Sequence, residues 1–144
     1  MTRLVFSLSV TSAVLIGGVS ALVNGRSTNI RLVGDKPWRG RVEVFARGEW
    51  GTVCDDFIND NLKGADVICK SLGYAYGVAS GRTVDSPAPD RIALDDVRCS
   101  GDEGSIFDCS SRSLFSHNCG HSEDYAVECR GKYTYLSGCG CDMF

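Results

Sequence analysis

Eight cysteines constrain this chain more than any other feature of its sequence. They lie in 144 residues behind an apolar N-terminal stretch. Cysteines of a chain that enters an oxidising compartment form disulfides, and sequence alone does not say which pairs form. We therefore expect a small domain held together by several disulfides. The cysteines are Cys54, Cys69, Cys99, Cys109, Cys119, Cys129, Cys139 and Cys141.

Residues 1–21 have the composition of a secretory signal peptide. Arg3 supplies the positive start, an apolar run extends from Leu4 to Val19, and small residues follow up to Ala21. This pattern predicts cleavage after Ala21. An uncleaved anchor is the less favoured alternative, because the run is short for a bilayer-spanning helix and contains Ser, Thr and Gly. We expect a secreted mature chain that does not span a membrane.

The charge balance argues against nucleic acid as a partner. The chain has 15 basic and 18 acidic residues, a net charge of −3. It therefore lacks the basic excess that neutralises a phosphate backbone. Its 43% hydrophobic and 23% charged residues are typical of a globular chain, and its length suits one domain.

The N-terminal half contains a hairpin pattern. Ile30–Val33 reads as a strand, and Arg41–Ala46 alternates apolar and polar residues as a half-buried strand does. Arg47–Gly48 suits the turn, and Glu49–Cys54 suits the returning arm. We expect these arms to form an antiparallel pair.

One helix is expected from Asn59 to Leu72, where apolar residues recur at helical spacing. Asn59, Asp60 or Asn61 can cap its first turn, and Gly73 suits the left-handed end. This is the main helix of the predicted fold.

The second half reads as short elements. Residues 75–91 look like a loop rich in Gly and Pro, and Ser105–Asp108 looks like one helical turn. Short strands are expected at Ile92–Leu94, Val97–Cys99 and Ala126–Cys129. Several strands with one helix indicate the α+β class.

Five segments together resemble one scavenger receptor cysteine-rich (SRCR) domain. They are GRVEVFARGEWGTVC (40–54), DVICKSLGY (66–74), LDDVRCSG (94–101), SIFDC (105–109) and HNCGHSEDYAVEC (117–129). The resemblance places a lead-in at 22–29, the domain at 30–130 and a tail at 131–144.

The resemblance implies a curved antiparallel sheet that cradles one main α-helix. It also implies the pairs Cys54–Cys119, Cys69–Cys129 and Cys99–Cys109. In the eight-cysteine type of domain a further bridge occupies positions that hold Trp38 and Tyr74 here. The chain therefore resembles the six-cysteine type.

Two groups of polar residues resemble divalent-cation sites of the family. Asp55, Asp56 and Glu123 would form the first, for Ca²⁺ or Mg²⁺. The second would consist of Asp95, Asp96 and Asn118. The alternative is that these residues are solvated or cap turns.

The stretch Arg41–Trp50 resembles the SRCR segment associated with binding to bacterial surfaces. We expect Arg41 and Arg47 to be exposed and to contact anionic groups, because guanidinium suits sulfate, phosphate and carboxylate. We expect Val42, Val44 and Trp50 to be core residues of a strand pair, so Arg47, at the turn, is the better ligand candidate.

Catalytic patterns are weak. The chain lacks GxSxG and HExxH motifs. His117, Cys119 and His121 have spacing that permits zinc, but a paired Cys119 would lack the thiolate that zinc binds. We therefore expect no enzyme activity.

We expect a secreted recognition module for polyanionic or microbial surface ligands, assisted by divalent cations. A domain specific for one receptor or matrix protein is the first alternative, and a structural piece without its own ligand is the second. Cys139 and Cys141 depart from the family pattern, and a bridge through either would link copies into an oligomer. A bridge within the tail and a disordered end remain alternatives.

Overall fold

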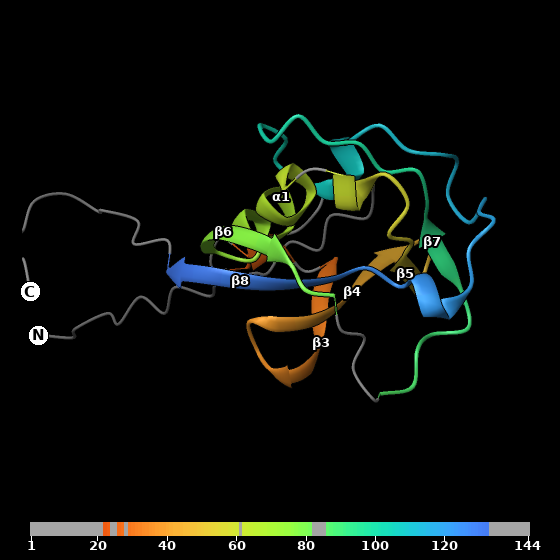
Figure 1. The fold of residues 1–144 in the computed structure, drawn as a ribbon, viewed down its shortest axis with the longest axis horizontal. Coiled ribbons are helices and arrows are strands. Elements are labelled where there is room, and N and C mark those ends of the chain that lie inside the picture. Colours follow the sequence, from red (N-terminus) through yellow and green to blue (C-terminus); the bar gives the residue numbers. More distant parts are fainter. Residues whose placement is uncertain (1–21, 24–25, 28, 61, 82–85, 133–144) are drawn as a thin grey trace, which may run out of the picture.

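The computed structural model describes residues 22–23, 26–27, 29–60, 62–81 and 86–132. Within them six strands form one curled sheet, and a single α-helix lies against it (Figure 1). None of the helices in these residues is long and apolar enough to cross a bilayer. The expected signal peptide and the cysteines at 139 and 141 lie outside the described residues.

Short strands and turns make up most of the regular structure in the described residues. The strands are β1 (Leu22–Val23), β2 (Arg26–Ser27), β3 (Ile30–Lys36), β4 (Arg39–Ala46), β5 (Glu49–Val53), β6 (Tyr74–Ala79), β7 (Ile92–Leu94) and β8 (Ala126–Lys132). The α-helix of the described residues is α1 (Lys63–Ser71). Their 3-10 turns are η1 (Ile58–Asp60), η2 (Ile106–Asp108) and η3 (His121–Glu123).

The main sheet is antiparallel except at one edge. Its strands follow the order β6-β8-β4-β5-β7, and β3 pairs with β4 outside this path. β5 and β7 run parallel, with Thr52 opposite Ile92. The expected curved antiparallel sheet with one main helix is therefore confirmed, and the parallel pair at its edge brings the ends of β5 and β7 together.

The core lies between the sheet and α1. Val42 and Val44 of β4 are fully buried, as are Ala65 and Ile68 of α1 and Val127 of β8. Burial of each larger aliphatic side chain stabilises the fold by roughly 1.5–3 kcal/mol. The predicted alternation of β4 is confirmed for these apolar positions.

The helix is shorter than the sequence predicts. The chain first makes the 3-10 turn η1, and α1 begins only at Lys63, with Leu62 at its N-cap and no capping side chain. The predicted caps at Asn59 and Asp60 are thus wrong, because η1 intervenes. Gly73 has φ +86°, which confirms the left-handed residue expected after the helix.

A strand replaces the first part of the predicted loop 75–91. β6 pairs with β8 and lies beside α1 (Figure 1). Gly77 therefore lies in a strand, where glycine often marks a close approach of backbone. A Cβ at this position would lie 2.6 Å from the sulfur of Cys69 and against the carbonyl of Ala65.

The three disulfides implied by the resemblance are confirmed: Cys54–Cys119, Cys69–Cys129 and Cys99–Cys109. Cys69–Cys129 ties α1 to β8. Trp38 and Tyr74 line one groove beside this bridge. Two aromatic side chains therefore lie where the eight-cysteine type would place its further bridge.

Candidate functional site

The residues assigned to the two cation sites meet where β5 and β7 end. Cys54 N–H donates to the carbonyl of Leu94 at 2.9 Å, and Asp55 N–H donates to the carbonyl of Glu123 at 2.8 Å. The Cys54–Cys119 bridge joins the same segments. Three separate stretches therefore contribute to one group, which we call the acidic cluster. Its members are Asp55, Asp56, Asp95, Asp96, Asn118 and Glu123.

Asp95 is the buried centre of the acidic cluster, with no exposed surface. Its Oδ1 accepts the N–H of Asp96 at 2.7 Å. Its Oδ2 accepts Nη1 of Arg112 at 3.3 Å and the N–H of Asn118 at 3.4 Å. Both oxygens of this buried carboxylate therefore have partners, as a buried charge requires.

Asp56 lies next to Asp95 in a different environment. One of its oxygens lies within 4.8 Å of an Asp95 oxygen and of both sulfurs of the Cys54–Cys119 bridge. Among the described residues no N–H or O–H group donates to this carboxylate. The Cys119 sulfur that it contacts belongs to a disulfide and has no proton to donate. Burial, followed by the charges of Asp95 and Glu123, raises the pKa of Asp56.

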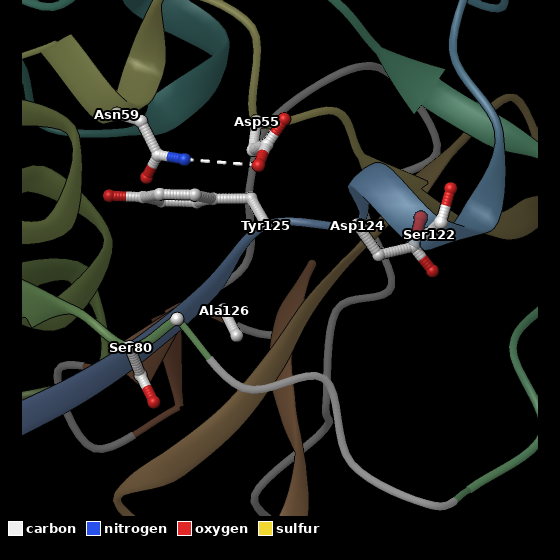
Figure 2. Close-up of a pocket in the computed structure, with 8 residues that line it drawn as sticks. Asp55, Asn59, Ser80, Ser122, Asp124, Tyr125 and Ala126 are labelled. Carbon is white, nitrogen blue, oxygen red and sulfur yellow. Dashed lines mark hydrogen bonds between the residues drawn. The ribbon is translucent and has the colours of Figure 1, made fainter.

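Asp55 and Glu123 flank this pair. Asp55 Oδ2 accepts the amide of Asn59 at 3.0 Å (Figure 2). Glu123 Oε2 instead accepts the N–H of Gly120 at 2.8 Å, at the start of η3. Burial, followed by the charges of Asp56 and Glu123, raises the pKa of Asp55. The cluster therefore holds carboxylates whose charges repel one another.

The cysteines beside the acidic cluster do not act as metal ligands, because a sulfur in a disulfide is not a thiolate. Cys119 is bonded to Cys54. The zinc alternative at His117, Cys119 and His121 therefore loses its thiolate.

Sequence reasoning missed Arg112. Its Nη1 lies 3.0 Å from Oδ1 of Asn118 as well as 3.3 Å from Asp95, and its Nε lies 3.9 Å from Asp96. The side chain is 44% exposed. A positive group therefore already lies among the residues assigned to the second cation site. No local pattern around Arg112 signals this, because its partners are distant along the chain.

A polar pocket of about 110 Å³ opens on the other side of Asp55. Asp55, Ser122 and Asp124 are among the residues that line it (Figure 2). Tyr125 forms part of the wall, and its buried hydroxyl has no hydrogen-bond partner among the described residues. Burial, followed by the charges of Asp55 and Asp66, raises the pKa of Tyr125.

Arg41 is not the exposed side chain that the sequence suggested. It is 2% exposed, and its guanidinium lies 2.8 Å from Glu43 and 3.9 Å from Asp124. It also donates to the carbonyls of Ser86 and Pro87, each at 2.9 Å. The expectation of exposure is wrong, because the segment that contains Ser86 and Pro87 contacts the second face of β4.

Arg47 is exposed at the tip of the β4–β5 hairpin, with φ 51°. Among the described residues no ion pair involves Arg47. On the hairpin the rings of Phe45 and Trp50 pack at a tilt of 57° with centroids 5.3 Å apart, and Arg31 lies 4.0 Å over Trp50. Trp50 is half-buried on this face and does not belong to the core. Sequence reasoning missed Arg31.

Comparisons with known proteins point to a single family. Residues 32–130 match the scavenger receptor cysteine-rich domain. Galectin-3-binding protein of Mesocricetus auratus is 42% identical over 113 residues, which cover 78% of this chain and 18% of that protein. A scavenger receptor cysteine-rich domain superfamily protein of Patiria pectinifera is 46% identical over 107 residues, which cover 72% of this chain and 9% of that protein. The match thus spans less than a fifth of either relative.

Two solved structures are similar in fold as well as sequence. The dimeric form of the SRCR domain of mouse MARCO has a TM-score of 0.54 at 44% identity, over 63% of this chain and 85% of that one. The third SRCR domain of murine neurotrypsin has a TM-score of 0.56 at 41% identity, over 69% and 94% of the two chains.

Proposed function

The chain belongs to the scavenger receptor cysteine-rich domain family, and from that premise we propose that it is a secreted, non-enzymatic recognition module. Its ligands are polyanionic or microbial surface molecules, and Ca²⁺ or Mg²⁺ assists their binding. Membership of the family supports a recognition role. The carboxylates of the acidic cluster would bind the cation, and the exposed Arg47 of the hairpin would bind the anionic ligand.

The Asp56 carboxylate is the observation that carries the proposal. It lies beside the buried carboxylate of Asp95, without a donor from the described residues. Carboxylate oxygens are the ligands of hard cations. An Asp95 oxygen lies within 4.8 Å of an Asp56 oxygen, whereas the oxygens of Asp55, Asp56 and Glu123 do not all lie that close together in the described residues. Asp55, Asp56 and Glu123 would hold the ion. A bound cation would offset their repulsion and supply a positive centre for an anionic ligand.

Arg47 supports the second half of the proposal. It lies at one end of β5, and Asp55 lies just beyond the other end. At about 3.3 Å per strand residue the two regions are roughly 20 Å apart. A small anion contacts one region only, whereas a polymer with repeated charges spans both. The arrangement therefore favours polymeric anions.

A binding assay on immobilised heparin and dextran sulfate tests this function. We expect binding that weakens as salt rises, since exposed charges are screened. Arg47→Ala should weaken it several-fold, and removal of calcium should weaken it further. Arg130→Ala is the matched control, because Arg130 is 51% exposed on β8 and pairs with Glu128. Binding that ignores salt, Arg47 and calcium would contradict the proposal.

One observation favours a second candidate, a domain specific for a protein partner. Phe45 is 37% exposed and packs against Trp50, and Trp38 is 44% exposed. Aromatic side chains are enriched in protein interfaces. Such a domain should bind one protein saturably, with weak dependence on salt. The polyanion assay therefore separates the two functions.

Multivalency would strengthen a weak single site. We propose that Cys139 or Cys141 links copies of the chain through a disulfide. Electrophoresis of the secreted protein with and without reductant tests this link. A dimer or larger band that collapses on reduction supports it, and a wholly monomeric oxidised band overturns it.

A further inference from the structure

The buried carboxylate of Asp95 separates the acidic cluster into two halves. Oδ1 lies on the side of the Cys54–Cys119 bridge, 3.4 Å from the sulfur of Cys119. Oδ2 faces Arg112 and the backbone of Asn118. One half therefore contains carboxylates that repel one another, and the other contains a guanidinium.

Both the backbone and the side chain of Arg112 hold it in the half of the acidic cluster that Oδ2 of Asp95 faces. Its N–H donates to the carbonyl of Asp95 at 3.0 Å. Its Nη1 contacts both Asp95 and Asn118, at 3.3 Å and 3.0 Å, and its Nε lies 3.9 Å from Asp96. All three residues that resemble a second cation site thus surround one guanidinium.

A cation and this guanidinium exclude each other. Ca²⁺ requires six to eight oxygen ligands at about 2.3–2.6 Å. Oδ2 of Asp95 and Oδ1 of Asn118 already accept hydrogen bonds from Arg112. An ion on the same oxygens would also meet a like charge a few ångströms away. The second half does not fit a divalent cation while Arg112 stays in place.

We infer that Arg112 is the resident counter-charge of the second half of the acidic cluster and lowers by one the number of divalent cations that the domain binds. The inference rests on the proposed function for the identity of the ion. What it predicts is the difference in the number of bound ions between the chain with Arg112 and the chain without it.

Calcium titration by calorimetry of the oxidised chain, with Arg112→Gln as the variant, tests the inference. The glutamine removes the charge and keeps a polar side chain. We expect Arg112→Gln to bind one more Ca²⁺ per chain than the wild type. An equal or lower number in the variant would overturn the inference.

Arg98→Gln is the matched control. Arg98 is an exposed arginine that stacks 3.7 Å over Phe57 and makes no ion pair among the described residues. The control changes net charge equally, so its cation number should equal that of the wild type. A gain of one ion in Arg98→Gln as well would assign the effect to net charge and overturn the inference.

The same titration separates this inference from the proposed function. If the wild type binds no calcium and Arg112→Gln binds one ion, the inference holds and the cation in the proposed function fails. If the wild type binds one ion and Arg112→Gln also binds one, the proposed cation stands and the inference fails.

Loss of Arg112 leaves the charge of Asp95 with fewer partners, so Arg112→Gln risks unfolding. Should it be unfolded without calcium, millimolar Ca²⁺ should restore the native circular dichroism spectrum, because an ion that binds the native state favours folding. Arg112→Lys keeps the charge and should bind as many ions as the wild type. Failure of calcium to restore Arg112→Gln, or an extra ion in Arg112→Lys, would overturn the inference.

Discussion

Arg41 Nη2 lies 2.8 Å from Glu43 Oε1, and the two side chains are only 3% and 1% exposed. Arg41 also lies 3.9 Å from the buried carboxylate of Asp124. We expect Arg41→Ala to destabilise the domain by about 3–5 kcal/mol, because it leaves buried carboxylates without a partner. Urea denaturation of the oxidised protein measures the loss.

Arg47→Ala is the comparison for Arg41. Arg47 is exposed at the hairpin turn, so its loss should change the free energy of unfolding by less than about 0.5 kcal/mol. An Arg41→Ala variant with wild-type stability but weaker binding to polyanions would contradict the structural role of Arg41.

The hairpin shows what sequence periodicity predicts and what it does not. Alternation correctly placed Val42 and Val44 on one face of β4. It could not show that the segment around Ser86 covers Arg41 on the other face, because that contact joins residues 45 positions apart. Periodicity assigns a residue to a face, and only the tertiary fold decides whether a face is solvated.

Loss of the charge on Asp56 should stabilise the cation-free domain. The pKa of Asp56 is raised in the folded state, so the native protein binds its proton more readily than the unfolded chain does. The free energy of unfolding that this group contributes is therefore lost as pH rises from the ordinary Asp pKa of about 3.9, which holds in the unfolded chain, through the raised pKa of the folded state. In EDTA at pH 7.5, Asp56→Asn should have a higher Tm than the wild type.

The pH dependence provides the control for this prediction. At pH 3.5 Asp56 is largely protonated in both the folded and the unfolded states, so the Tm advantage of Asp56→Asn should shrink or disappear. A lower Tm for the variant at pH 7.5 without cations would show that the charged carboxylate has a stabilising partner.

The membership of the acidic cluster was more predictable than its arrangement. The resemblance named Asp55, Asp95 and Glu123, and the parallel pairing of β5 with β7 brings their segments together. The role of Arg112 depends on the loop that brings it to Asp95, 17 positions away in sequence. Long-range contacts of this kind leave no periodic signal.

The two long disulfides should contribute more stability than the short one. Cys54–Cys119 and Cys69–Cys129 span 65 and 60 residues, whereas Cys99–Cys109 spans 10. The chain-entropy relation gives about 4 kcal/mol for each long loop and about 3 kcal/mol for the short loop. Alanine pairs at each bridge, compared by urea denaturation, should follow this order. A larger loss at the short bridge would contradict it.

Gly77 should not tolerate a side chain. A Cβ there would lie 2.6 Å from the sulfur of Cys69 and against the backbone of α1. We expect Gly77→Ala to cost about 1–3 kcal/mol through overpacking. Gly81→Ala is the control, since nothing lies within 4 Å of a Cβ there. Equal stability of the two variants in thermal unfolding would contradict the packing of β6 on α1.

Calorimetric titration of the oxidised mature domain with calcium tests cation-assisted recognition at the acidic cluster. The measurement compares the wild type with Asp56→Asn and with Asp90→Asn, which removes an exposed carboxylate outside the acidic cluster. We expect saturable calcium binding by the wild type and by Asp90→Asn, and loss of binding in Asp56→Asn. No binding by the wild type at millimolar calcium, or unchanged binding in Asp56→Asn, would contradict cation-assisted recognition at the acidic cluster.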